Sequence, residues 1–257
     1  MGKQARLKQE RRRVRAAAPP ARRAPNLPRQ VAAVAIVAFA VLAVAIGGNL
    51  VSRPGPAPAG LAGAAEAAAL FRDIPQQGTV LGRPDAPLTL AIYVDPQCPY
   101  CGVWDRQALP AIVERYVRPG TLRAEFRGLA FVGPDSDRGL RALLAAGEQN
   151  RLFQAQTLLY ANQGAENSGW LSERFVASLA ASVPGLDATR LNADLHSAAV
   201  DAAIRTAVEQ QRADGVDGTP TLLVGPTGGT LAAVDLRSLE PEGTIPAIDQ
   251  ALAELSP

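Results

Sequence analysis

The chain has only two cysteines and one histidine among its 257 residues. A tetrahedral zinc site needs four ligands, so a zinc site is not predicted. A chain of this length buries enough apolar surface to fold without disulfide cross-links. Aromatic residues make up 5% of the chain although 47% of it is hydrophobic. This composition indicates a core built mainly from small aliphatic side chains.

Acidic residues are almost missing from residues 1–30, which contain ten Lys or Arg and a single acid, Glu10. The remainder of the chain carries an acidic excess. Residues 31–46 then contain no polar side chain, and the apolar stretch continues to Val51, about the ~20 residues that span a bilayer as a helix. A basic segment before such a stretch predicts a cytoplasmic N-terminus rather than nucleic-acid binding.

These features divide the chain into four expected parts. Residues 1–30 are a basic cytoplasmic tail, 31–51 a transmembrane signal anchor, 52–75 a Pro/Gly/Ala linker, and 76–257 an extracytoplasmic domain. Two other interpretations of the apolar stretch stay open: a buried Ala-rich helix, and a signal peptide cleaved near the small residues at 57–59.

The outer domain has the pattern of an α/β sheet. The expected order is a strand at 88–94, a helix at 98–118 kinked at Pro110, a strand at 121–127, a helical block at about 135–213, a hairpin from 219 to 236, and a helix at 244–255. Such an order predicts a sheet with a helical insertion between its second and third core strands.

Both cysteines lie in one short motif, CPYC, directly after the first expected strand. Cys98 opens a helix, where unpaired amides and the helix dipole favour a thiolate, and Pro99 suits the first turn. Cys101 lies one turn later, close enough to form a disulfide with Cys98 and shielded enough to act as a resolving thiol. The alternatives are half of a zinc site completed by the distant His196, and a structural disulfide, which in so small a loop would stabilise little.

Two stretches, GRPDAPLTLAIYVDPQCPYC (82–101) and GVDGTPTLLVG (215–225), resemble the DsbA-like branch of the thioredoxin superfamily, thiol-disulfide oxidoreductases of the bacterial cell envelope. The resemblance covers about residues 78–254 and includes the helical insertion. It implies a thioredoxin-like domain whose redox pair exchanges disulfides with other proteins.

The resemblance also implies a role for individual residues. Cys98 would be the nucleophile and Cys101 the resolving cysteine; Pro99 and Tyr100 would tune the thiolate; Pro220 would be a cis-proline, with Thr219 binding an extended substrate; and Asp95 would relay a proton or cap its loop. The chain departs from many relatives at Ile92, where they carry a buried Glu, and at Pro96, where an aromatic residue is common.

The predicted function is a protein disulfide oxidase acting on secreted or envelope proteins. The family implies reoxidation by a quinone-linked membrane protein of the DsbB or vitamin K epoxide reductase type. The domain is expected to be monomeric, without cofactor, metal or nucleic acid. A reductase or isomerase stays open, because redox direction depends on small differences in thiolate stability. A binding or chaperone module with an inert disulfide is the alternative from another class.

Overall fold

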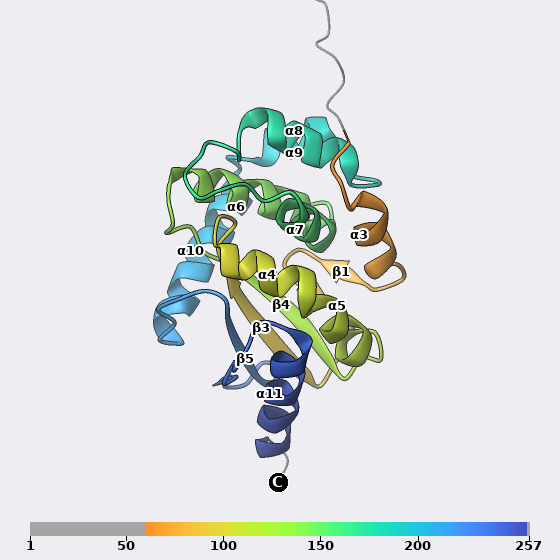
Figure 1. Ribbon diagram of the computed structural model, residues 1–257, viewed down its shortest axis with the longest axis vertical. Coiled ribbons are helices and arrows are strands. Elements are labelled where there is room, and N and C mark those ends of the chain that lie inside the picture. The colour runs from red at the N-terminus through yellow and green to blue at the C-terminus, as the bar shows by residue number, and fades with distance from the viewer. Residues whose placement is uncertain (1–59, 256–257) are drawn as a thin grey trace, which may run out of the picture. The chain divides into compact units, whose positions relative to one another are not determined.

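In the computed structural model, which describes residues 60–255, two seven-residue strands lie parallel at the centre of a sheet (Figure 1). These are β3 (Leu88–Val94) and β4 (Leu122–Gly128). The sheet has the order β1-β2-β4-β3-β5-β6, and every pair except β3–β4 is antiparallel. The other strands are β1 (Gln76–Gln77), β2 (Val80–Leu81), β5 (Thr221–Pro226) and β6 (Ala232–Ala233).

Helices make the connections between the strands. Parallel strands need a long crossover, and β3 reaches β4 through a helical stretch of three consecutive segments, α4 (Pro99–Gln107), α5 (Leu109–Ile112) and the π-helix η1 (Val113–Val117). Five helices between β4 and β5 form the insertion: α6 (Pro134–Gly147), α7 (Leu152–Ala161), α8 (Glu173–Ser182), α9 (Ala188–Asp194) and α10 (Ala198–Ala213). The last helix, α11 (Pro241–Glu254), packs against β5 and α5.

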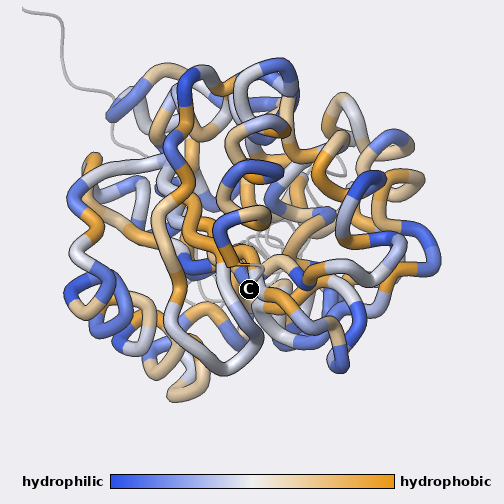
Figure 2. The backbone as a smooth tube through the Cα atoms, turned by 90° about the horizontal axis from the view of Figure 1, so that it is seen from below, coloured by the Kyte–Doolittle hydropathy of each residue, from blue (hydrophilic) through white to orange (hydrophobic). Residues whose placement is uncertain are grey.

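The central strand β3 is buried on both faces, as its largely apolar sequence predicts. Leu90, Ile92 and Val94 belong to the main hydrophobic core with α4 and α7, whereas Ala91 and Tyr93 belong to a smaller cluster on the opposite face. This alternation is the two-residue period of a strand. Figure 2 shows hydrophobic stretches through the middle of the domain and hydrophilic ones mostly at its rim.

The expected order of elements is confirmed, including the strand at 88–94 and the helical insertion. The helix after the cysteines is interrupted at Ala108, two residues before the expected kink, because Pro110 occupies the first turn of a new helix. The edge hairpin of β1 and β2 has strands too short to leave an alternating pattern, and the sequence analysis missed it.

The end of the expected linker belongs to the folded domain. Residues 64–70 form α3 (Ala64–Leu70), which packs against α7, and Phe71 is buried in the main core. The Ala-rich composition that suggested a linker is therefore that of a short helix with one buried face. The expected tail at 1–30, the anchor at 31–51 and the first part of the linker lie outside the described residues. Within residues 60–255, no helix has the length and hydrophobicity needed to cross a bilayer.

Candidate active site

The end of β3 delivers Cys98 to the N-cap of α4. Cys98 has an extended backbone, and its Sγ accepts a hydrogen bond from the Cys101 amide at 3.4 Å. Pro99 follows at the first helical position, as expected. Cys98 retains 6% of its accessible surface and Cys101 none, and both are free thiols in the structure. Only the first thiol is therefore within reach of another molecule.

The loop before β5 closes the other side of the site. The peptide bond between Thr219 and Pro220 is cis, which confirms the expected cis-proline. The Cys98 thiol donates to the Thr219 carbonyl at 3.4 Å, so two motifs separated by more than a hundred residues meet at one sulfur atom. Tyr100, between the cysteines, is 64% exposed and lies beside Cys98 in the chain. The predicted substrate-binding role of Thr219 and Pro220 stays a prediction.

The two thiols have opposite acidities. The pKa of Cys98 is lowered to about 6, first by a hydrogen bond from the Cys101 thiol, and further by the side-chain hydroxyl of Thr219 and by the amides of Cys101 and Tyr100. The pKa of Cys101 is raised far above its usual range, because the thiol is buried and lies beside the negative charge of Cys98. At neutral pH the pair therefore holds one exposed nucleophile and one buried, protonated thiol.

We expect alkylation of Cys98 by iodoacetamide to follow a titration with a midpoint near pH 6, because only the thiolate reacts. The Cys101→Ala variant removes the largest stabilising contact, so its midpoint should move upward. Stopped-flow rates between pH 4 and pH 9 measure both. A wild-type midpoint near the ordinary thiol pKa of 9.0 would contradict this assignment.

Asp95 is fully buried and holds the loop that precedes the cysteines. One carboxylate oxygen accepts from the Gln97 amide at 2.8 Å and the Ser136 hydroxyl at 2.6 Å. The other accepts from the amides of Phe131 and Val132 at 2.8 and 3.1 Å. Through these contacts Asp95 caps its loop, which is one of the two roles expected for it. The other role, as a proton relay, stays a prediction.

Two glutamines that the sequence analysis missed also fix this loop. The buried Gln97 side chain contacts Ser136 and Asn167, and its carbonyl oxygen accepts from the Asn167 amide at 2.7 Å. Gln163 donates to the carbonyls of Cys98 at 3.0 Å and Pro96 at 3.3 Å. A glutamine has no motif of its own, so only the folded insertion reveals these contacts.

Ile92 is fully buried in the main core and brings no charge to the site. Pro96, the other departure, is buried where the chain turns toward α4 and approaches the Cα of Gly139 on α6 closely enough that no β-carbon would fit there.

His196 lies in the helical insertion and lines a separate open cavity of about 560 Å³ bounded by α6, α8 and α9. Within residues 60–255, no group of His, Cys, Asp or Glu side chains is arranged to hold a metal ion.

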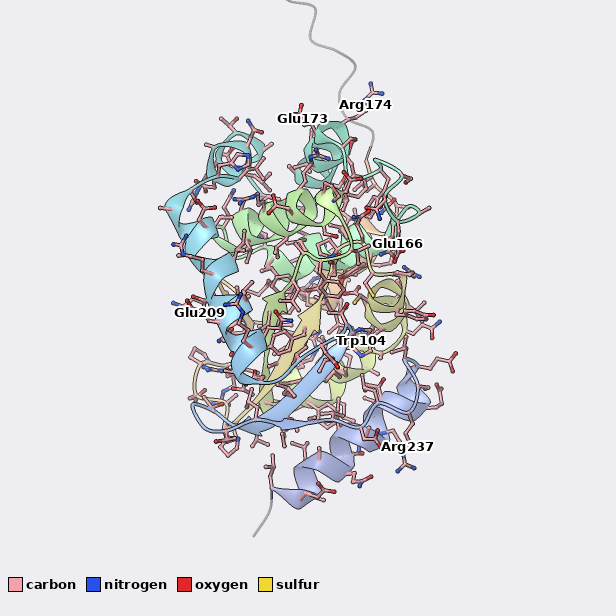
Figure 3. All side chains as sticks on the ribbon, turned by 90° about the vertical axis from the view of Figure 1, so that its left-hand side faces the viewer. Trp104, Glu166, Glu173, Arg174, Glu209 and Arg237 are labelled. Carbon is pink, nitrogen blue, oxygen red and sulfur yellow. The ribbon has the colours of Figure 1, made fainter. Side chains whose placement is uncertain are left out.

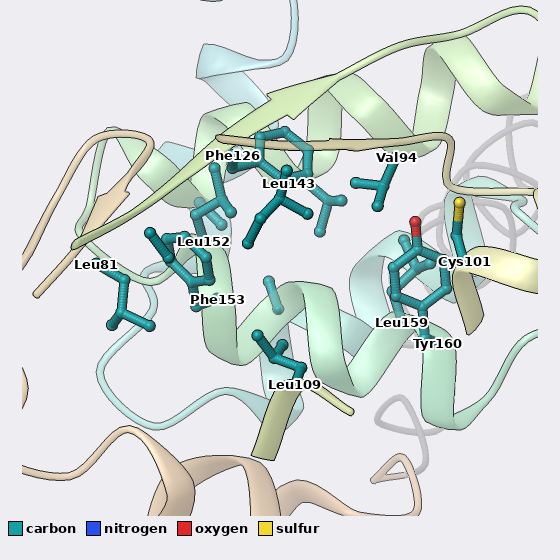
Figure 4. Close-up of a cluster of buried hydrophobic side chains, with 14 of the residues drawn as sticks. Leu81, Val94, Cys101, Leu109, Phe126, Leu143, Leu152, Phe153, Leu159 and Tyr160 are labelled. Atoms are coloured by element: carbon teal, nitrogen blue, oxygen red, sulfur yellow. The ribbon is translucent and has the colours of Figure 1, made fainter. Parts of the chain in front are cut away.

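A second acid, Asp105, lies one helical turn after Cys101 on α4 and was not predicted. It is fully buried on α4, and burial raises its pKa to about 7 despite a hydrogen bond from Gln156. Tyr160 of α7 is also fully buried, and its hydroxyl donates to the Asp95 carbonyl at 2.9 Å. Figure 4 shows Cys101 and Tyr160 at the same end of the hydrophobic cluster. The core beside the site therefore contains the polar side chains of Asp105, Gln156 and Tyr160 among apolar ones.

Comparisons with known proteins match this geometry. A family model described as thioredoxin matches residues 75–229. A probable disulfide bond formation protein D from Bacillus anthracis is 29% identical over 163 residues, which cover 62% of this chain and 74% of that protein. The crystal structure of a thioredoxin-like oxidoreductase from Silicibacter pomeroyi DSS-3 is 27% identical with a TM-score of 0.53, covering 72% of this chain and 97% of that one. The crystal structure of oxidised BdbD from Bacillus subtilis has 18% identity and a TM-score of 0.58, and covers 71% of this chain and all of that one. The region matched by the family model, 75–229, holds the first five strands of the sheet, the insertion and both cysteines, so the expected thioredoxin-like α/β fold is confirmed.

Proposed function

Because the chain belongs to the thioredoxin family and is a thiol-disulfide oxidoreductase, we propose that it works as an oxidase of the DsbA type. It would transfer the Cys98–Cys101 disulfide to reduced cysteine pairs in secreted or envelope proteins. The observation that carries this direction is the stabilised thiolate of Cys98 at the start of α4.

The direction follows from what the thiolate does to the redox equilibrium. A thiolate exists only in the reduced enzyme, so stabilising it favours the dithiol and makes the disulfide more oxidising. A pKa of about 6 in place of the ordinary 9.0 stabilises the dithiol at pH 7 by about 1.4 kcal/mol, or about 30 mV for a two-electron couple. Protonation removes this contribution as the pH falls below about 6.

In the proposed reaction, a substrate thiolate attacks Cys98 Sγ, and the electron pair of the broken disulfide goes to Cys101. A second substrate thiolate attacks the substrate sulfur of the mixed disulfide and releases Cys98 as a thiolate. Two substrate thiols thus become one disulfide, and the enzyme pair gains two electrons. A quinone-linked membrane reoxidase of the DsbB or vitamin K epoxide reductase type would remove these electrons and restore the disulfide.

The reduction potential of the pair tests the direction. The full-length protein in detergent is equilibrated in glutathione buffers, and the oxidised fraction is counted by thiol labelling. We expect a value of roughly −120 to −180 mV, in the range of protein disulfide oxidants. A value near −270 mV, the potential of thioredoxin, would instead make the protein a reductase. The same preparation should oxidise a reduced two-cysteine protein stoichiometrically.

We also propose that the domain lies outside the cytoplasm, held by the apolar stretch at 31–51. The basic tail before this stretch and the acidic excess after it support this orientation. In intact cells, a membrane-impermeant maleimide should label Cys98 of the reduced protein without lysis. Labelling that requires lysis would place the domain in the cytoplasm. Since Cys101 is buried, the Cys98→Ser variant is the matched control for background labelling.

A further inference from the structure

Cys101 must exchange a proton in every turnover, and it has no access to solvent. Its thiol leaves as a thiolate when the disulfide is attacked, and it must lose its proton before it can attack in the reverse step. The thiol is fully buried, and its pKa lies far above neutrality. A buried thiolate of this kind is unstable unless an acid or base beside it exchanges the proton.

Neither position 92 nor Asp95 offers a carboxylate oxygen without a hydrogen-bond partner for this exchange. Position 92, on the strand below the cysteines, holds an isoleucine. The Asp95 carboxylate accepts four hydrogen bonds, from three backbone amides and the Ser136 hydroxyl, so both of its oxygens are already engaged. The proton of Cys101 therefore needs another partner.

Asp105 lies one helical turn after Cys101 on α4. Side chains four residues apart share a helix face, with Cβ atoms about 5–6 Å apart. Helical side chains also lean toward the N-terminus, which tilts the Asp105 carboxyl toward the turn that carries Cys101. Both side chains are completely buried, so a proton that passes between them is not exchanged with solvent water.

On the facing helix α7, Gln156 and Tyr160 are also four residues apart. Gln156 Nε2 donates to Asp105 Oδ2 at 2.7 Å, and Tyr160 lies one turn later on α7. Burial raises the pKa of Tyr160, and the nearby Cys101 and Asp105 raise it further. Other titratable groups near this contact are Asp95 and Cys98, whose charges also raise the pKa of Tyr160, and the exposed Arg106, whose guanidinium donates to the Tyr160 carbonyl at 2.7 Å. Cys101 and Asp105 of α4 and Gln156 and Tyr160 of α7 are thus all fully buried where the two helices pack together.

One oxygen of the Asp105 carboxyl accepts no hydrogen bond of good geometry. Among the described residues, Asp105 Oδ1 is buried and has no hydrogen-bond partner, and the same holds for the side-chain oxygens of Gln156 and Thr157. A buried carboxyl that served only to hold α4 against α7 would engage both oxygens, as Asp95 does. The Thr157 hydroxyl lies close enough to lower the pKa of Asp105, but a hydroxyl can rotate, so the Oδ1 oxygen of Asp105 can accept a proton and release it.

We propose that Asp105 is the acid and base that exchanges the proton of Cys101, in place of a buried acid at position 92. This rests on the proposed roles of Cys98 and Cys101 but not on the direction of electron flow. A group with a pKa of about 7 carries and gives up its proton with equal ease at neutral pH, which is the optimum for such exchange.

The step balances in both directions. When a substrate thiolate attacks Cys98 Sγ, the Cys98–Cys101 bond breaks, its electron pair stays on Cys101, and protonated Asp105 gives that sulfur its proton. When Cys101 attacks a mixed disulfide at Cys98, its proton goes to the Asp105 carboxylate, the Cys98–Cys101 bond forms, and the partner sulfur leaves as a thiolate. No external oxidant or reductant enters either step.

The reaction of the reduced full-length protein with Ellman's reagent separates the two thiols. Cys98 attacks the reagent and releases one thionitrobenzoate; Cys101 then attacks the mixed disulfide and releases a second. In the Asp105→Asn variant we expect the first phase to stay unchanged and the second to slow by about 10²-fold, the lower end of general acid–base contributions. The second phase of the wild type should also have an inflection near pH 7 that the variant lacks.

Two further variants separate proton exchange from packing. Gln156→Leu removes the hydrogen bond that stabilises the Asp105 carboxylate, so the inflection should move to higher pH. Glu209→Gln, the same carboxyl-to-amide change at an exposed position of α10, should leave both phases unchanged (Figure 3). An unaltered first phase shows that α4 is folded in each variant.

A second phase of Asp105→Asn with the wild-type rate and pH profile would overturn the proposal. If the variant does not fold, the infrared difference between oxidised and reduced wild-type protein replaces it: a protonated carboxyl band must change with redox state. No such band would again overturn the proposal. A reduction potential near that of thioredoxin would overturn only the oxidase assignment, since both phases occur in either direction.

Discussion

The Cys98→Ser variant is expected to lose thiol-disulfide exchange by about 10⁶-fold, the order observed when an enzyme loses its nucleophile. Cys98 is the only thiol at the start of α4 with exposed surface, and its lowered pKa supplies the thiolate at neutral pH. A serine hydroxyl cannot replace it, because it is neither ionised nor able to form a disulfide. Oxidation of a reduced two-cysteine protein by the full-length chain measures the loss.

The Cys101→Ser variant is the matched control, because it also retains a single thiol. It should still attack a disulfide through Cys98 but cannot resolve the product, so mixed disulfides with cell-envelope proteins should accumulate. Non-reducing electrophoresis after acid quenching detects them. Equal activity of wild type and Cys98→Ser in cells would indicate a binding module instead, with cysteines that take no part in its function.

The stability of the domain should depend on Asp105 in a pH-dependent way. Its pKa is raised from 3.8 to about 7 by burial, so the folded state retains a proton that the unfolded state has lost. The folded domain therefore has its full stability below about pH 4, loses stability as the pH rises toward 7, and is constant above that. A shift of this size corresponds to at most about 4 kcal/mol of unfolding free energy.

The Asp105→Asn variant does not titrate, so it should gain stability relative to the wild type between pH 4 and pH 8. Urea unfolding of the oxidised full-length proteins at both pH values measures the change, and the disulfide prevents titration of the cysteines. Glu209→Gln, at an exposed position, should show no comparable change. A stability difference between Asp105→Asn and wild type that is the same at pH 4 and pH 8 would contradict the raised pKa of Asp105.

Several features of this protein were determined by local sequence. The stretch at 88–94, apolar except for Thr89, predicted β3 to the residue, because a strand buried on both faces is apolar at nearly every position. The CPYC motif predicted a helix opened by Cys98, because a proline in the first turn and the amides around a thiolate act within four residues. Only the family resemblance, not the local pattern, predicted the cis bond before Pro220.

The tertiary structure alone decided how the site is supported. In the sequence, Asp105 cannot be told from an exposed acid on a helix. It is buried only because α7 packs against α4 and brings Gln156, 51 positions along the chain, beside it. The same docking brings Gln163 to the Cys98 carbonyl. Burial and hydrogen bonding between distant segments set the acidity of a group, whereas a local pattern reports only propensity. The sequence therefore locates the two cysteines of the motif, and the packing of the helical insertion buries Asp105 one turn after them.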